Sequence, residues 1–314
     1  MNLSGKFIVF QSIILFPFII GYFSKDKMKD IAGITRKLIR FNLILIEPII
    51  ALWSIWGLKL DKALIFLPVG GMFLVFLGWT LGFVLSLFLH LSRKSRATYL
   101  ISSSLANHGF TMGGFLCYLF LGETGLGYSF LFLAYFVPYI YLFIFPYAMR
   151  MSRVNAFSLR EALLNLQNMP LYAVIAALGL HWAGIQRPGI ELPVDILLVI
   201  SIPIYYYSLG LNFRFSDIKS LGREAITMGM SKFLILPVLT FLILMVIPAR
   251  EPVKLVIFIQ SFMPAAIYSV LASILYDLDT PQASGLFIVN TVTFLLVVLP
   301  ALFWAKPYLI MFIR

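Results

Sequence analysis

The stretch SSSLANHGFTMGGFL, residues 102–116, decides the fold of this chain. It lies inside a long apolar sequence, where a membrane-spanning helix is expected, yet it contains an Asn-His pair, three glycines and a run of hydroxyl groups. Glycine in a helix interior lowers helix stability. In lipid, an unpaired backbone group is so costly that a helix break persists only where it faces protein or a water-filled cavity. The stretch therefore predicts an interrupted membrane helix whose break is enclosed by the protein.

The composition places the whole chain in a membrane. Of its 314 residues, 61% are hydrophobic and 12% are charged, whereas a soluble domain is about half apolar and about a quarter charged. The net charge of +11 comes from basic residues in short loops, which indicates membrane orientation rather than binding to nucleic acid. The single cysteine, Cys117, excludes an intramolecular disulfide. We expect an all-α polytopic protein of the lipid bilayer, with no cleaved signal peptide.

Ten stretches are long and apolar enough to span a bilayer, which takes about 20 residues. They are residues 7–23, 38–57, 64–91, 99–121, 126–148, 169–185, 192–213, 224–247, 253–276 and 282–304. One face of this arrangement carries 15 Lys and Arg residues in its loops, and the other face carries 8. By the positive-inside rule, both termini lie outside and the 149–168 connection lies in the cytoplasm. We expect a multi-pass protein of the plasma (inner) membrane.

An internal repeat is the next prediction, because the 149–168 connection divides the ten spans five and five. An offset of 155 residues pairs Pro48 with Pro203, and Gly109 with Pro264. Each half has an odd number of spans, so the second half would be inserted upside down relative to the first. The expected domains are an N-terminal five-helix repeat (1–148) and an inverted C-terminal five-helix repeat (169–314), the plan of many secondary transporters.

A second interruption lies at the position that the repeat pairs with the opening stretch. It is QSFMPAAIYSVLAS, residues 260–273, in which Pro264 lacks a backbone N–H and clashes with the preceding turn. Two broken helices at matching positions of two repeats indicate a transport site. A half-helix that starts after a break presents unpaired N–H groups and the positive end of its dipole. The pair of breaks therefore predicts a site for an anion such as a carboxylate; the alternative is ordinary helix packing.

The chain resembles the auxin efflux carrier family of membrane transporters at several of these positions. The sequence NHGFTMGG keeps the Asn107, Gly109 and Phe110 of that family's first signature, with Gly114 where the family usually has proline. The second signature is matched by Met263-Pro264, Leu271-Ala272, Tyr276 and Asp279, and the last span is similar in Asn290, Thr291 and Pro300. The bile acid:sodium symporters are expected to share the fold.

This resemblance implies a fold in which the broken fourth and ninth helices cross near the membrane centre. Helices 1, 2, 6 and 7 would form a scaffold, and helices 3–5 and 8–10 a moving transport bundle. A homodimer through the scaffold helices is an expected assembly. By that analogy, Asn107 is the residue expected to contact the substrate. The expected substrate-binding residues are Asn107, His108, Gly109, Gly113, Gly114, Pro264, Ala265, Tyr268 and Asn290.

Ionisable and polar residues at membrane depth are candidates for coupling transport to an ion. Glu47, which directly precedes Pro48, is either a proton or cation site or a neutral carboxyl group hydrogen-bonded between helices. His108 either relays a proton or satisfies a carbonyl at the break. Gln260 is a possible Na⁺ ligand, or an inter-helix hydrogen-bonding group. Lys232 is expected to reach the cytoplasmic surface as an anchor, with an internal counter-ion as the alternative.

The function expected from these features is secondary transport, in the direction of efflux, of a small organic anion by elevator-type alternating access. The coupling ion is a proton or Na⁺, or coupling is absent. The alternatives are a sodium-coupled organic anion importer of the bile acid symporter type and a membrane sensor or receptor without transport. The chain contains no nucleotide-binding motif, no catalytic-triad order, no helical metal-ligand motif and no haem motif. We therefore expect no enzyme activity, no cofactor and no metal site.

Overall fold

The computed structural model describes residues 3–152, 166–214 and 221–305. Of the described residues, 83% are helical and none lies in a strand, so the prediction of an all-α protein is confirmed. Residues 153–165 of the predicted cytoplasmic connection, and both chain ends, lie outside the described residues. The chain divides into two compact units, each assembled from two separate parts of the sequence.

Six helices within the described residues are long and apolar enough to cross a membrane, which supports an integral membrane protein. These are Gly33–Trp56, Lys62–Ser86, Met112–Ser152, Val194–Asn212, Arg223–Val246 and Thr280–Ala305. The Met112–Ser152 run is two helices, because Gly122 interrupts it with φ 65° and ψ −152°. A residue with a side chain rarely adopts this conformation, so the glycine permits the turn that the sequence predicts between residues 121 and 126. The count of ten spans stays a prediction.

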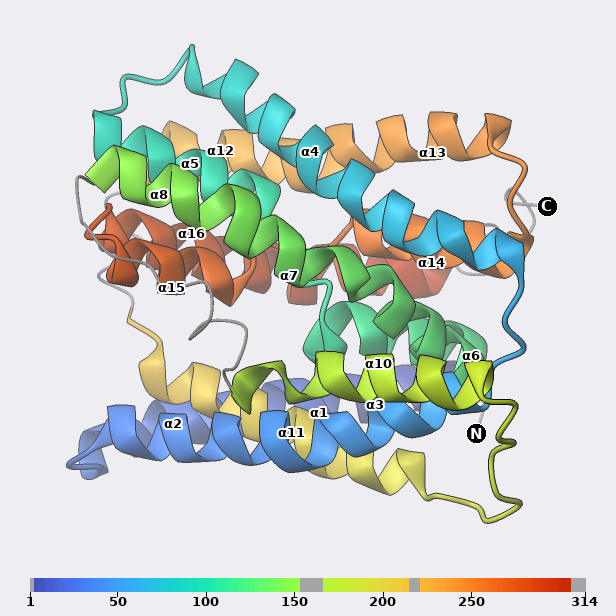
Figure 1. Cartoon of the computed structure of the whole chain (residues 1–314). Coiled ribbons are helices and arrows are strands. Elements are labelled where there is room, and N and C mark those ends of the chain that lie inside the picture. Colours follow the sequence, from blue (N-terminus) through green and yellow to red (C-terminus); the bar gives the residue numbers. More distant parts are fainter. Residues whose placement is uncertain (1–2, 153–165, 215–220, 306–314) are drawn as a thin grey trace. The chain divides into compact units, whose positions relative to one another are not determined.

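The first unit comprises residues 1–59 and 160–214. Its helices are α1 (Leu3–Ser24), α2 (Ile31–Phe41), α3 (Glu47–Trp56), α10 (Met169–Trp182) and α11 (Val194–Asn212). Within this unit α1 packs along α11, and α10 packs along α3 (Figure 1). A Cβ atom on Gly21 would collide with the backbone of Tyr207, and one on Gly210 with that of Phe18. The two glycines therefore allow α1 and α11 to approach to backbone contact.

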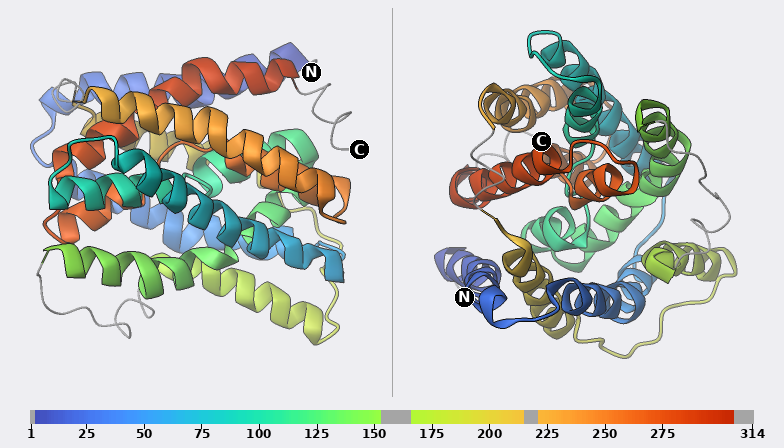
Figure 2. Two further views of the ribbon diagram at one scale, coloured as in Figure 1. Left: turned by 90° about the horizontal axis from the view of Figure 1, so that it is seen from above. Right: turned by 90° about the vertical axis from the view of Figure 1, so that its left-hand side faces the viewer.

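The second unit comprises residues 60–159 and 215–314. Its helices are α4 (Phe66–Ser86), α5 (Arg93–Ser104), α6 (Phe115–Phe132), α7 (Phe136–Tyr139), α8 (Phe145–Ser152), α12 (Arg223–Met230), α13 (Leu236–Val246), α14 (Glu251–Ser261), α15 (Ile267–Leu275) and α16 (Thr280–Thr293). Helix α5 packs on α4 and α16, and α14 packs on α4, α6 and α13. Seen end-on in Figure 2, most of these helices run along a common direction. Buried Tyr99, Met228 and Leu286 belong to one core cluster that joins α5, α12 and α16.

Short π-helical segments join several of these helices into longer runs. They are η2 (Asn42–Ile46), η6 (Ile140–Ile144), η9 (Ser231–Ile235) and η10 (Phe294–Val298). Each ends two residues before a proline, respectively Pro48, Pro146, Pro237 and Pro300. Proline removes one N–H from the helix and displaces the carbonyl four residues earlier, so the preceding residue bonds five residues back instead. The Glu47 N–H accordingly donates to the Asn42 carbonyl, and the Leu236 N–H to that of Ser231.

Candidate functional site

Two helix interruptions lie in the second unit. Helix α5 ends at Ser104, and the next helical segment, η4 (Phe110–Gly114), leads into α6. Leu105, between them, has extended backbone angles, φ −77° and ψ 129°. Helix α14 ends at Ser261, and α15 starts at Ile267 after a non-helical segment that contains Pro264. The structure thus places breaks in both stretches that the sequence singles out.

The two interruptions meet each other and pair through their backbones. Ala106 and Ala265 form an isolated antiparallel bridge. The Asn107 N–H donates to the Pro264 carbonyl at 2.8 Å, and the Ala266 N–H donates to the Leu105 carbonyl at 3.1 Å. Backbone groups released from the helices are therefore satisfied by the opposite break, as burial in a membrane protein requires. We call residues 105–109 and 262–266 the crossing.

His108 is the most buried polar side chain of the crossing, at 1% exposure. Its Nδ1 atom lies 2.5 Å from the Tyr135 hydroxyl, and its ring packs edge-on against Phe132. Its Nε2 atom has no hydrogen-bond partner among the described residues. The carbonyl of His108 accepts from the Gln260 Nε2 atom at 3.2 Å. The Nδ1 atom of the imidazole is therefore hydrogen-bonded to Tyr135, whereas Nε2 has no hydrogen bond to the described residues.

Gln260 ties the second break to the first. Its side chain is fully buried, and its Oε1 atom has no partner among the described residues. A Cβ atom on Gly113 would collide with this amide and would press on the His108 carbonyl. Gly114 faces the Ser129 hydroxyl, 2.9 Å from where its Cβ would stand, whereas a Cβ on Gly109 would meet nothing within 4 Å. Of the three glycines, Gly113 is the one at which the packing leaves least room for a side chain.

Lys232 corrects the prediction of a surface anchor. Its side chain is 1% exposed, and its Nζ atom donates to the Leu105 carbonyl at 3.0 Å. The π-helical segment η9 carries it, and α12 puts two helical turns between it and the start of that span. The carbonyl of Leu105, left without a helical partner by the break, gives the ammonium an acceptor inside the protein. The internal alternative is therefore the one that the structure supports.

The remaining predicted residues of the second unit are placed around this core. Ala265 is buried in the bridge, and Tyr268 packs edge-on against Phe136 at 4.8 Å between ring centroids. Asn290 of α16 is 1% exposed and donates to the Leu286 carbonyl one turn earlier at 3.0 Å. Its Oδ1 atom has no partner among the described residues.

Glu47 belongs to the first unit and not to the unit that contains the crossing. Its carboxylate is buried at 6% exposure and accepts a hydrogen bond of 2.5 Å from the Tyr205 hydroxyl. Nearby Asn42 donates to the Ser201 carbonyl at 2.9 Å. These bonds join η2 and α3 to α11, so the hydroxyl of Tyr205 serves inter-helix bonding. A coupling role for Glu47 stays a prediction.

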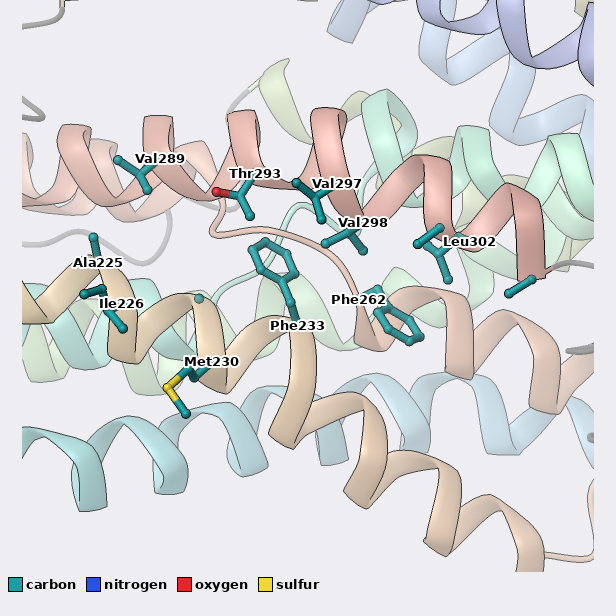
Figure 3. A pocket seen from close by; sticks show the side chains of 13 residues that line it. Ala225, Ile226, Met230, Phe233, Phe262, Val289, Thr293, Val297, Val298 and Leu302 are labelled. Atoms are coloured by element: carbon teal, nitrogen blue, oxygen red, sulfur yellow. The ribbon is translucent and has the colours of Figure 1, made fainter.

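An apolar groove of about 660 Å³ lies between the spans that contain α12 and α16 (Figure 3). Figure 3 shows Phe233 and Phe262 facing the row formed by Thr293, Val297 and Val298. Thr293 contributes the only side-chain hydroxyl to the groove, and the described lining contains no charged side chain. A carboxylate would find no counter-charge in this groove, so its chemistry differs from that of the crossing.

The described residues contain no group of three or more His, Cys, Asp or Glu side chains that could hold a metal ion. Two contributors to the crossing, Lys232 and Tyr135, were not among the predicted site residues. The signal for Lys232 was a lysine inside an apolar run, SKFLILP, five residues before a proline. Tyr135 gave no signal, because it is one aromatic residue among many.

No protein-family model matches the chain, and no curated protein matches it significantly.

Proposed function

We propose that this protein is a secondary transporter that moves a small organic anion across the membrane, in the direction of efflux. The observation that carries the proposal is the crossing, where two helix interruptions 157 residues apart in sequence, at Asn107 and Pro264, share a 2.8 Å backbone hydrogen bond. Half-helices that begin at such a break direct their positive dipole ends and first N–H groups toward it. Midplane sites of this construction bind substrates in many transporters.

The chain's two units support an elevator-type cycle. One unit combines residues 1–59 with 160–214, and the other combines 60–159 with 215–314. We propose that the first is the scaffold of helices 1, 2, 6 and 7, and that the second is the moving bundle of helices 3–5 and 8–10. Ten spans in two inverted repeats, and membership of the auxin efflux carrier family, form part of this proposal.

In the proposed cycle, the anion binds at the crossing and the second unit carries it from one side of the membrane to the other. Asn107 contacts the substrate, and the bonded pair His108 and Tyr135 fixes the wall beside it. Coupling is to protons through His108 or Glu47, or is absent. The burial of both side chains would make any proton reach them by way of the protein interior.

A sodium-coupled importer is the second candidate, favoured by two buried oxygen atoms. The Oε1 atom of Gln260 and the Oδ1 atom of Asn290 have no partner among the described residues. Amide oxygens of this kind are suitable ligands for a hard cation. Sodium dependence of substrate binding separates this candidate from the exporter.

The test is transport by the purified protein in vesicles of inverted orientation. Uptake of radiolabelled mono- and dicarboxylates would be measured with and without a pH gradient, in sodium and in choline buffer. The exporter predicts uptake that does not require sodium. Asn107→Ala should abolish it, whereas the matched control Asn212→Ala, at an exposed asparagine of the first unit, should transport normally. Normal transport by Asn107→Ala would remove the crossing as the site.

A further inference from the structure

The ammonium group of Lys232 is a buried charge that the described structure does not neutralise. Lys232 is among the largest side chains of the protein that are completely buried, at 1% exposure. No carboxylate of the described residues lies within 4.0 Å of its Nζ atom. The hydrogen bond to the Leu105 carbonyl uses one of its three N–H donors. Removing an ammonium from water costs more than one carbonyl hydrogen bond returns.

The position of this charge is the junction of the two breaks. The Leu105 carbonyl accepts from the Lys232 ammonium at 3.0 Å and also from the Ala266 N–H at 3.1 Å. Ala266 is the N-cap of α15, so the positive end of that nine-residue helix begins at the same carbonyl. Two independent sources of positive potential therefore converge on the crossing.

A third group marks the same place. His108 belongs to the crossing, three residues after the Leu105 whose carbonyl binds Lys232, and its buried Nε2 atom has no partner among the described residues. An imidazole nitrogen that carries a proton is a hydrogen-bond donor to an anion. An ammonium, a helix N-terminus and a histidine together provide the charge and the donors that a carboxylate needs.

A purely structural role would be to cap the C-terminus of α5, because the Leu105 carbonyl that accepts from Lys232 belongs to the C-cap residue of this helix. Cations at helix C-termini are mildly stabilising when exposed. A neutral donor would satisfy the Leu105 carbonyl equally well without bringing a charge into the interior. The choice of a lysine therefore indicates a partner that arrives with a negative charge.

We propose that Lys232 is the fixed counter-ion of the transported anion. The inference rests on the proposed function and names the residue that selects for negative charge. The substrate carboxylate pairs with the ammonium at the crossing, so binding neutralises the buried charge and requires no accompanying sodium ion. Substrate-free protein retains the unneutralised charge and is less stable than it would be with an apolar residue at this position.

The test compares the melting temperature of the detergent-solubilised protein for wild type, Lys232→Met and Lys232→Arg. Lys62→Met, at an exposed lysine of the same unit, is the matched control. Each is melted alone and with the choline salts of acetate, benzoate, succinate and citrate at constant ionic strength. We expect Lys232→Met alone to melt several degrees above wild type. We also expect it to lose the stabilisation by whichever carboxylate protects wild type, with affinity weakened about tenfold or more.

Lys232→Arg should keep part of the carboxylate response, because it keeps the charge, and Lys62→Met should behave as wild type. Carboxylate stabilisation of Lys232→Met equal to that of wild type would overturn the role of Lys232 and leave the transport proposal standing. A Lys232→Met protein that melts below wild type would show that the lysine is a structural cap, which also overturns it. A wild type that responds to none of the carboxylates would contradict the proposed function itself and the counter-ion role with it.

Discussion

At the scale of single residues, two buried ionisable side chains, Glu47 and Lys232, lie shortly before prolines. Glu47 directly follows the π-helical segment η2 and precedes Pro48, and Lys232 lies within η9, five residues before Pro237. A π-helical segment leaves carbonyl groups displaced from the regular ladder, and such segments occur often at functional sites. These two side chains, whose burial is energetically costly, thus lie where the helix backbone is irregular.

The hydrogen bond between Tyr205 and Glu47 gives the first prediction. Tyr205→Phe leaves a buried carboxyl group without its 2.5 Å donor, which should lower the free energy of unfolding by about 1–3 kcal/mol. Thermal unfolding in detergent measures the loss. Tyr207→Phe, whose hydroxyl has only a 4.0 Å contact to the Met28 sulfur, is the control and should change little.

A double-mutant comparison distinguishes this bond from general packing. In a Glu47→Gln background the buried carboxylate is gone, so Tyr205→Phe should cost less than it does in wild type. An equal cost in both backgrounds would show that the tyrosine acts through its ring and not through its hydroxyl.

Sequence reasoning reached some of these residues and misjudged one. Glu47 was visible because an ionisable residue inside an apolar run is rare and marks a candidate functional site. Lys232 was assigned to the surface because lysines near span ends usually extend to water. The carbonyl that holds it belongs to Leu105, 127 residues away in the sequence. A contact between residues so far apart in the sequence cannot be predicted from a local sequence pattern.

At the scale of elements, helix breaks were predictable and helix irregularities were not. Gly109, Gly113 and Pro264 marked both interruptions, because glycine and proline weaken helices by known mechanisms. The π-helical segments were not expected, although a proline follows four of them by two residues. Proline explains a changed hydrogen-bond register after the fact, but the same residue also produces simple kinks.

The glycines of the first break give the second prediction. Gly113→Ala would push a methyl group into the Gln260 amide and the His108 carbonyl, which should destabilise the protein by about 1–3 kcal/mol and impair transport. Gly109→Ala is the matched control for stability, because its added Cβ would meet nothing within 4 Å. Its backbone angles, φ −65° and ψ 179°, suit alanine.

Melting temperature and uptake, measured for both variants, check this prediction. The packing described at the crossing would be contradicted if the two alanine variants were equally stable.

At the scale of the whole molecule, composition alone was enough for the class of protein. A hydrophobic fraction of 61% favours helices whose backbone groups are satisfied internally, and 83% of the described residues are helical. The grouping into two units, each from two separate parts of the chain, depends on contacts between distant segments. Hydropathy does not encode such contacts, and only the resemblance offered an expectation for them.

Membrane orientation is the third prediction. The unequal division of Lys and Arg, 15 against 8, predicts that both termini lie outside. In a Cys117→Ala background, Gln186→Cys should react with a membrane-impermeant maleimide in intact cells, and Asn212→Cys only after permeabilisation. Both positions are exposed ends or loops of the first unit. The reverse labelling pattern would invert the proposed orientation and the direction assigned to transport.

The central claim is that the two interruptions meet, and one disulfide tests it most directly. Ala106 and Ala265 are bridge partners flanked by the two inter-break hydrogen bonds. This pairing places Cα atoms about 4.5 Å apart, within the range of a disulfide. Ala106→Cys with Ala265→Cys, in a Cys117→Ala background, should form an intramolecular disulfide on mild oxidation, detected as loss of both free thiols by mass spectrometry. Two thiols that stay free under oxidation, in a protein that melts cooperatively, would contradict the crossing and the transport site built on it.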